Sequence, residues 1–317
     1  MDNLNIVWPN KISICEVGLR DGLQNEKVIL GVEEKLELLD MVVSSGIKII
    51  EVGSFVNHKA VPQMANTEQV VHLMKRVDGV EYRALVPNLR GLERAHAAGL
   101  TKAKLTVSVS ESHCINNFNQ KPLDMMKGFI PCVEYATKHN IKVSGALSSA
   151  WGCAFEGKIP LAQIEKIVLQ YLNIGITELS LSDATGMANP RQVYEIGSYM
   201  VRTYPQVKWI LHFHNTRGMA LGNIVAGIQA GITTFDGSFA GLGGCPYIPG
   251  ASGNIPTEDV IHMIHEMGID TGVDLSKAIT TANRAKQMVG HDVSSYILKA
   301  GRCEDLTKEK FHHQNNK

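Results

Sequence analysis

Two kinds of apolar pattern alternate along most of the chain. Short apolar runs are typical of buried strands, and longer segments with apolar positions every three or four residues are typical of helices. The short runs predict strands at residues 11–17, 47–52, 81–86, 103–109, 142–148, 178–181, 208–214 and 233–239. The longer segments predict helices at residues 33–45, 66–76, 88–98, 122–139, 160–173, 190–203, 219–230 and 256–267. The chain therefore repeats a strand–helix unit eight times between residues 11 and 268.

The repeated unit indicates an α/β fold. Alternating strands and helices form a parallel sheet with right-handed crossovers, and eight such units predict a closed (β/α)8 barrel, or TIM barrel. A doubly wound open sheet is the alternative, but it would carry a G-x-G-x-x-G turn, and residues 18–22 read Gly-Leu-Arg-Asp-Gly. We expect residues 1–290 to form one catalytic domain, with a C-terminal helical extension outside the barrel at residues 276–289, and residues 291–317 to form a tail.

Composition narrows the class of protein further. The chain has 317 residues, of which 44% are hydrophobic, so it can bury a large core. Its 31 Lys and Arg balance its 31 Asp and Glu, and without a basic block we expect no nucleic-acid partner. No apolar run approaches the ~18 residues of a membrane span, and the first residues do not resemble a signal peptide. The six cysteines are scattered and form no C-x-x-C motif, which favours a reducing, cytoplasmic location.

The predicted strand at residues 208–214 contains two histidines among apolar residues. His212 and His214 are two positions apart, so their side chains point to the same face, about 6–7 Å apart along the backbone. Packing alone does not readily explain two imidazoles on one face of a buried strand, whereas binding of one metal ion does. Two hydrogen-bonded histidines near a strand end are the alternative explanation.

Other polar side chains stand at the ends of predicted strands, where the active sites of such barrels lie. Arg20 and Asp21 follow the first strand, Glu51 lies in the second, and Asp183 follows the sixth. Each one alone could be a turn, cap or ion-pair residue. Together with two histidines and the amide of Asn254, they predict a divalent-cation site. Nitrogen and oxygen ligands without a thiolate suit Mg²⁺ or Mn²⁺, with Zn²⁺, Fe²⁺ or Co²⁺ as alternatives.

Glycines surround Cys245 after the eighth predicted strand, at positions 237, 241, 243, 244 and 250. A glycine-rich segment adopts backbone shapes that other residues resist, and it could close over a ligand. A cysteine in such a segment predicts a chemical role, and a structural cysteine in a linker is the alternative.

These residues together resemble the 3-hydroxy-3-methylglutaryl-CoA lyase family, one of the metal-dependent barrel lyases, a group that also includes isopropylmalate and homocitrate synthases. The similarity extends over nearly all of residues 11–290. The motifs that carry it lie at residues 20–26, 51–56, 86–88, 178–183, 212–214 and 241–254. The last motif, Gly-Leu-Gly-Gly-Cys-Pro-Tyr followed by Gly-Ala-Ser-Gly-Asn, is highly specific, because the synthases usually carry a different loop there.

The resemblance implies a role for each of these residues. The metal ligands would be Asp21, His212, His214 and Asn254. The catalytic residues would be Arg20 at the thioester carbonyl, the carboxylates Glu51 and Asp183, the loop cysteine Cys245, and His212 or Asp183 as the base. Lys27 would contact the CoA phosphates, with an ordinary surface lysine as the alternative.

The reaction implied by the resemblance is retro-Claisen cleavage of 3-hydroxy-3-methylglutaryl-CoA to acetoacetate and acetyl-CoA. Residues 115–116 and 154–155 depart from the family's usual pattern in loops that could frame the substrate, so a related thioester such as citramalyl-CoA is an alternative. A condensing synthase, a non-catalytic acyl-CoA-binding barrel and a ketoacid aldolase are further alternatives, but Arg20 and the Cys245 loop favour the lyase. The resemblance also implies a homodimer and a place in leucine catabolism and ketone-body formation.

Overall fold

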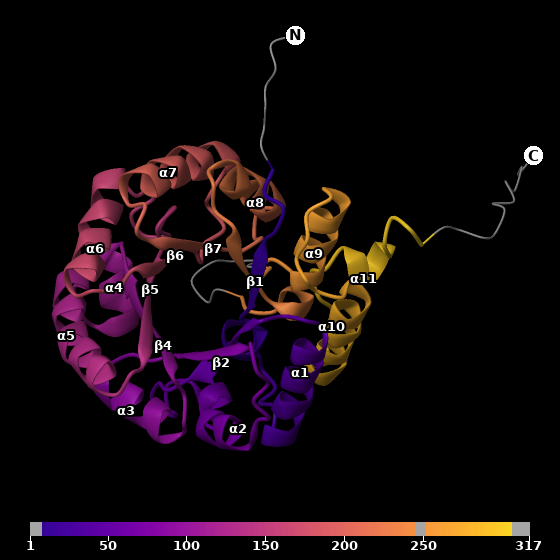
Figure 1. Ribbon diagram of the computed structural model, residues 1–317, viewed down its shortest axis with the longest axis horizontal. Helices are drawn as coiled ribbons and strands as arrows, with labels where there is room; N and C mark the ends of the chain where they lie inside the picture. The colour runs from indigo at the N-terminus through magenta and orange to yellow at the C-terminus, as the bar shows by residue number, and fades with distance from the viewer. Residues whose placement is uncertain (1–7, 245–251, 306–317) are drawn as a thin grey trace, which may run out of the picture.

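Eight parallel strands form a closed barrel in the computed structural model, which describes residues 8–244 and 252–305 (Figure 1). Strands that are neighbours in the chain are neighbours in the barrel, and β1 pairs with both β2 and β8, which closes the ring. The strands are β1 (Ser13–Glu16), β2 (Ile49–Ser54), β3 (Glu81–Leu85), β4 (Lys102–Ser108), β5 (Lys142–Ser148), β6 (Glu178–Asp183), β7 (Lys208–Phe213) and β8 (Thr234–Gly237). The predicted (β/α)8 barrel is therefore confirmed.

Helices form an outer ring around the strands (Figure 1). They are α1 (Val32–Ser44), α2 (Thr67–Leu73), α3 (Leu89–Ala97), α5 (Pro122–Lys138), α6 (Leu161–Asn173), α7 (Pro190–Thr203), α8 (Ala220–Gln229) and α9 (Thr257–Glu266). The predicted C-terminal helical extension is confirmed as α10 (Leu275–Val289), and α11 (Ile297–Ala300) lies in the segment predicted as a tail. One further helix, α4 (Glu111–Phe118), was not predicted. It begins at Ser110, whose hydroxyl oxygen accepts the N–H of His113 at 3.1 Å.

The core lies between the strands and the inner faces of the helices. Strand residues such as Leu181 and Leu211 are fully buried, as expected for a parallel sheet covered on both sides. In α6 the buried Ile164, Val168 and Tyr171 recur every three or four positions, which gives the helix one apolar face. The buried hydroxyl of Tyr171 lies 3.0 and 3.1 Å from carbonyl oxygens of β4 and β5, so the helix is also hydrogen-bonded to the barrel.

A buried cluster of charges fills the N-terminal end of the barrel. Arg83 of β3 lies 3.0 Å from Glu178 of β6, and Lys102 of β4 donates to the same carboxylate at 2.9 Å. Burial would raise the pKa of Glu178, but Arg83 and Lys102 lower it to about 2. The paired charges occupy this end of the barrel, which leaves the C-terminal end for chemistry, as in other barrels of this kind.

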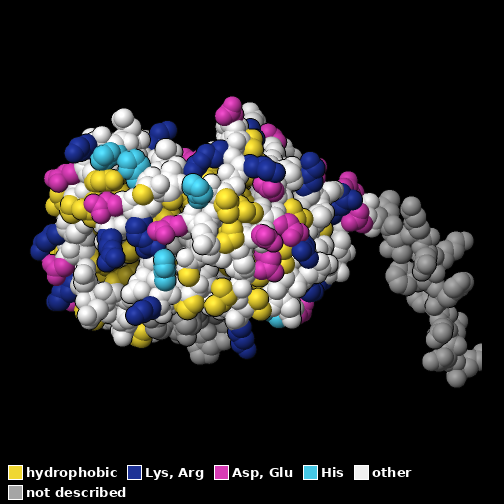
Figure 2. All heavy atoms as spheres, turned by 90° about the horizontal axis from the view of Figure 1, so that it is seen from below, with side chains coloured by type: hydrophobic (Ala, Val, Ile, Leu, Met, Phe, Trp, Pro, Cys, Tyr) yellow, Lys and Arg dark blue, Asp and Glu magenta, His cyan; other side chains and the backbone are white. Residues whose placement is uncertain are grey.

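The described surface carries mixed charge. Figure 2 shows acidic and basic side chains interspersed over one face, in keeping with the equal numbers of the two in the sequence. The exposed hydrophobic residues Leu73, Phe155 and Tyr296 belong to segments far apart in the chain. None of the helices formed by residues 8–244 and 252–305 is long and apolar enough to cross a membrane.

Candidate active site

Asp21, His212 and His214 meet at the C-terminal end of the barrel. His214 Nε2 lies 3.3 Å from Oδ2 of Asp21, and His212 Nε2 lies 3.7 Å from the same oxygen. The potential ligand atoms of the three residues lie within 4.8 Å of one another, and all three residues are buried. The two imidazoles face the same way, with ring centroids 5.3 Å apart, as the alternation along the strand predicted.

A tight turn after β1 positions Arg20 and Asp21. The N–H groups of Arg20, Asp21 and Gly22 all donate to the carbonyl oxygen of Val17, at 3.0, 2.8 and 3.2 Å. These bonds wind Gly18–Gly22 into a single π-helical turn, a form that occurs frequently at functional sites. All five residues of the turn are buried, so the turn holds both charged side chains inside the mouth of the barrel.

Asn254 reaches the same cluster from the segment after β8. Its Nδ2 donates to Oδ2 of Asp21 at 2.7 Å and to the carbonyl oxygen of Leu242 at 2.9 Å. A cation would bind the amide oxygen instead, so ligation by Asn254 requires the amide to turn. Gly243 permits this close packing, because a β-carbon there would lie 2.5 Å from both Asn254 and Asp21 and its φ of +105° favours glycine.

Arg20 lies between two carboxylates. Its guanidinium donates to Oδ1 of Asp21 and to Oε1 of Glu51. Burial alone would raise the pKa of Asp21, but the charge of Arg20 and the hydrogen bond with His214 hold that pKa well below its ordinary value. Burial also opposes ionisation of Glu51, whereas Arg20 and Lys104 lower its pKa. Both carboxylates are therefore ionised at neutral pH and hold Arg20 in place.

Two buried residues that the sequence analysis did not select complete this network. Lys104 of β4 donates to Oε2 of Glu51 at 2.9 Å and lies 3.4 Å from Oδ2 of Asp236. Asp236 of β8 accepts the N–H of His212 Nδ1 at 3.1 Å. Asp236 gave a signal like that of Glu51, a single acid in a predicted strand, whereas Lys104 follows Lys102 in an alternating pattern that gave none.

Asp236 sets the tautomer of His212. Because a carboxylate can only accept, Nδ1 of His212 carries a proton, which leaves Nε2, 3.7 Å from Oδ2 of Asp21, as the nitrogen that a metal ion would take. Histidines that bind metals are commonly held in this way by a carboxylate on the other ring nitrogen. A buried carboxylate and two imidazoles, without a thiolate, fit the divalent cation that the sequence predicted.

Asp183 is buried beside this cluster but directs its carboxylate to the loop that follows β6. Its Oδ1 accepts the N–H of Met187 and the hydroxyl of Thr185, both at 3.0 Å, and its Oδ2 accepts the N–H of Ala188 at 2.9 Å. Burial raises the pKa of Asp183 against the effect of these hydrogen bonds. The backbone oxygen of Asp183 accepts the N–H of His214 at 3.1 Å, which places the backbone of Asp183 next to the histidines.

The comparisons with known proteins agree on one family. A family model described as HMGL-like matches residues 11–284. The chain belongs to the HMGL-like family. It is 40% identical to a hydroxymethylglutaryl-CoA lyase of Bacillus subtilis, over 92% of this chain and 97% of the relative. It is 38% identical to the human mitochondrial hydroxymethylglutaryl-CoA lyase, over 92% of this chain and 90% of the relative.

Solved structures of the HMGL-like family superpose closely on the chain. An HMG-CoA lyase from Acinetobacter baumannii, in complex with coenzyme A and 3-methylmalate, matches with a TM-score of 0.91 at 38% identity, covering 95% of this chain and 98% of that one. The Bacillus subtilis HMG-CoA lyase structure matches with a TM-score of 0.89 at 40% identity, covering 92% and 98%. The fold predicted from the repeated strand–helix unit is thus the fold of the family.

The structure describes one of the two remaining residues selected for the family resemblance and not the other. Lys27 is exposed on the segment that joins the turn after β1 to α1. Cys245 lies outside the described residues. Its neighbour Gly244 is described, and the carbonyl oxygen of Gly244 accepts the side-chain N–H of Asn25 at 2.6 Å. Gly244 is therefore anchored to the segment that carries Asp21.

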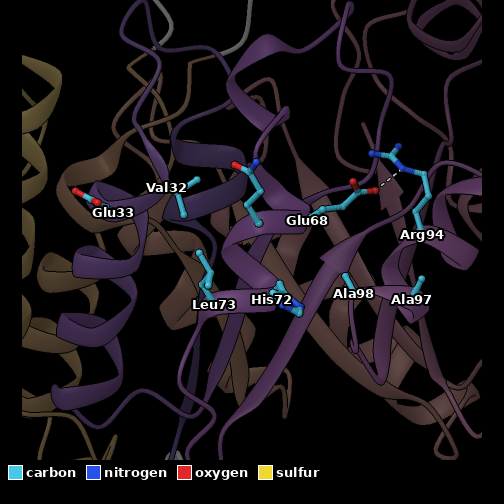
Figure 3. A pocket seen from close by; sticks show the side chains of 9 residues that line it. Val32, Glu33, Glu68, His72, Leu73, Arg94, Ala97 and Ala98 are labelled. Carbon is cyan, nitrogen blue, oxygen red and sulfur yellow. Dashed lines mark hydrogen bonds and ion pairs between the residues drawn. The ribbon is translucent and has the colours of Figure 1, made fainter.

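A groove on the outer wall of the barrel is separate from this site. It lies between α1, α2 and α3, holds about 730 Å³, and is lined by Val32, Glu33, Glu68, Gln69, His72, Leu73, Arg94, Ala97 and Ala98 (Figure 3). The charged pair in its wall is already satisfied, because Arg94 donates to Glu68 at 2.6 Å. None of the residues proposed for catalysis or metal binding lines this groove.

Proposed function

We propose that this chain is a carbon–carbon lyase that cleaves 3-hydroxy-3-methylglutaryl-CoA to acetoacetate and acetyl-CoA. The observation that carries the proposal is the buried cluster of Asp21, His212 and His214 beside the Arg20–Glu51 pair. A relative from Pseudomonas aeruginosa, 37% identical over 92% of this chain, is named as a lyase of both 3-hydroxy-3-isohexenylglutaryl-CoA and hydroxymethylglutaryl-CoA. That name, and the coenzyme A complex of the Acinetobacter enzyme, support a 3-hydroxyglutaryl-CoA thioester as the substrate class.

Asp21, His212 and His214 would hold the divalent cation, with Asn254 after its amide turns. Mg²⁺ or Mn²⁺ bound there would lower the pKa of a coordinated substrate hydroxyl. Asp236 keeps His212 in the tautomer that can serve as a ligand. The negative charge of Asp21, maintained by Arg20, gives the cluster its affinity for a cation.

Asp183 is the better of the two predicted bases. In His212, Nδ1 is held by Asp236 and Nε2 faces the metal position, so neither nitrogen is free to take a proton. Burial raises the pKa of Asp183, which makes its carboxylate a stronger base than an ordinary aspartate. Asp183 would accept the proton of the C3 hydroxyl as the C2–C3 bond breaks and C3 becomes the ketone of acetoacetate.

Arg20 would stabilise the enolate that forms on the acetyl-CoA side. The electron pair of the broken bond moves onto the thioester oxygen, and a fixed guanidinium in a buried site is suited to that charge. Glu51 and Lys104 would keep Arg20 in position, since Glu51 bonds to both. The thiol of Cys245 would then protonate C2, which completes acetyl-CoA and balances the proton removed from the hydroxyl.

The products of a reaction run in D2O with Mn²⁺ test this scheme. We expect acetoacetate and acetyl-CoA in equal amounts, with one deuterium on the acetyl methyl group, because solvent-derived deuterium is delivered to C2 once. The Asp183→Asn variant should cleave the substrate about a hundred-fold more slowly than the wild type, because it lacks the general base. If the Asp183→Asn variant turned over as fast as the wild type, Asp183 would not be the base and would serve only to hydrogen-bond the loop.

A homodimer and a cytoplasmic location remain predictions from the sequence. Light scattering after gel filtration tests the dimer by mass. Fractionation of cells that express the untagged chain tests the location. Neither outcome changes the chemistry proposed for the site.

A further inference from the structure

A second cluster of potential metal ligands lies outside the barrel, where the chain that follows α11 returns to α9. His262 and Glu266 stand four residues apart on α9 and therefore share one face of that helix. Cys303 follows α11, and its Sγ lies 3.4 Å from Nε2 of His262. Figure 1 shows α9 and α11 side by side, away from the mouth of the barrel.

The spacing of these three side chains matches a tetrahedral zinc site. One nitrogen, one sulfur and one carboxylate oxygen lie within 4.8 Å of one another. Zn–S and Zn–N bonds of about 2.3 and 2.0 Å at the tetrahedral angle place sulfur and nitrogen roughly 3.5 Å apart. The 3.4 Å between Cys303 Sγ and His262 Nε2 is close to that value. Glu266 and Cys303 are exposed and His262 is half-buried, so the cluster is open to ions from solvent.

The backbone around the cluster is fastened on both sides. Asp259, one turn before His262 on α9, accepts the hydroxyl of Ser295 and the N–H groups of Tyr296 and Ile297, all at 2.9 Å. Arg302, next to Cys303, donates to Ser276 at 3.1 Å and to Asp305 at 2.8 Å. Cys303 is therefore presented to α9 by a segment held to α9 and to the start of α10.

The chemistry of the ligands favours a different metal from that of the barrel. A thiolate is a poor ligand for Mg²⁺ and a good one for Zn²⁺. The four other cysteines that the structure describes are buried, and Cys303 is exposed. Zn²⁺ bound there would take the cysteine as its thiolate and pair with both anionic ligands.

We propose that His262, Glu266 and Cys303 form a Zn²⁺ site, with water as the fourth ligand, that fastens the segment after α11 to α9. The site is distinct from the metal cluster in the barrel and takes no part in the cleavage reaction. Its role is structural, because it ties together two segments that meet only after the barrel is complete.

Cobalt spectroscopy on the full chain, with Mg²⁺ in excess, tests the proposal. Thiolate bound to Co²⁺ gives a charge-transfer band in the near ultraviolet, which the N and O ligands of the barrel cluster do not. We expect the band in the wild type and in Cys245→Ser, and its loss in Cys303→Ser. Added Zn²⁺ should displace Co²⁺ and abolish the band. His262→Ala should weaken Zn²⁺ binding by about ten-fold or more. His72→Ala, which changes an exposed histidine on α2, is the matched control.

His312 and His313 lie outside the described residues and could bind metal on their own, so each variant is also made with both changed to alanine. Unchanged lyase activity in Cys303→Ser and His262→Ala would show that the variants fold. A Co²⁺ band that survives Cys303→Ser, or Zn²⁺ affinity unchanged in both variants, would overturn the proposal.

Discussion

Asp236→Asn is the most informative single change in the network, because it removes charge while keeping shape. The two hydrogen bonds of Asp236, from His212 at 3.1 Å and from Lys104 at 3.4 Å, both end on Oδ2. Its Oδ1 has no hydrogen-bond partner among the described residues. An asparagine can therefore place its carbonyl oxygen where Oδ2 lies and accept both bonds as a neutral group.

The expected loss of Mn²⁺ affinity follows from how many of the two hydrogen bonds to Asp236 support metal binding. A hydrogen bond to a charged group contributes about 1 kcal/mol more than a neutral one. The His212 bond alone then predicts about five-fold weaker Mn²⁺ binding, and both bonds together predict about thirty-fold. The upper figure falls within the roughly 10–100-fold range found when the partner of a metal-binding histidine is changed. The buried amide left at Oδ1 should also lower the free energy of unfolding.

Calorimetric titration of the metal-free protein with Mn²⁺ measures this loss directly. Glu178→Gln is the matched control, because Glu178 is a half-buried carboxylate that pairs with a lysine, at the other end of the barrel. It should lower the free energy of unfolding without changing Mn²⁺ affinity. If Asp236→Asn bound Mn²⁺ as tightly as the wild type, Asp236 would not set the state of His212.

Three other changes test separate parts of the account. Arg20→Gln should lower kcat by roughly a hundred- to a thousand-fold, measured at saturating metal; a smaller loss would mean that the guanidinium does not face the developing charge. Cys245→Ser should lower kcat at least about a hundred-fold while Mn²⁺ affinity stays the same, and full activity would make Cys245 structural. Burial raises the pKa of Glu258 from 4.5 to about 8, because the folded protein favours the protonated carboxyl group. The stability that the protonated group provides is complete below its unfolded pKa and is lost as pH rises through about 8. The uncharged Glu258→Gln should therefore have the higher thermal midpoint of the two proteins at about pH 9, and equal midpoints there would contradict a raised pKa.

The meeting of His212 and His214 in one candidate metal site could be predicted because their signal is local. His212 and His214 share a strand, and a period of two fixes their common face whatever the rest of the fold does. Glu51 was visible as a lone acid in an apolar run. Lys104 was not visible in this way, because Lys102 and Lys104 alternate with apolar residues. The same alternation is found in strands that have one face in water. Its partners come from β2 and β8, and pairing across a closed barrel leaves no trace in local sequence.

The barrel was predictable from the count of strand–helix units, although the pairing of β1 with β8 joins segments more than two hundred residues apart. The fine geometry was not. That Asp183 gives its carboxylate oxygens to the loop after β6, and that Asn254 turns its nitrogen toward Asp21, depends on tertiary contacts. The helix α4 was missed because only His113 and Cys114 are buried in it, too few for a visible apolar period.

Release of acetyl-CoA from 3-hydroxy-3-methylglutaryl-CoA by the purified chain tests the proposed lyase activity most directly. The assay offers this substrate and citramalyl-CoA side by side, each with Mg²⁺, with Mn²⁺ or with EDTA. We expect release from 3-hydroxy-3-methylglutaryl-CoA that depends on the metal and is abolished by EDTA. Release only from citramalyl-CoA would keep the chemistry and change the substrate, and release from neither by the metal-loaded protein would contradict the account.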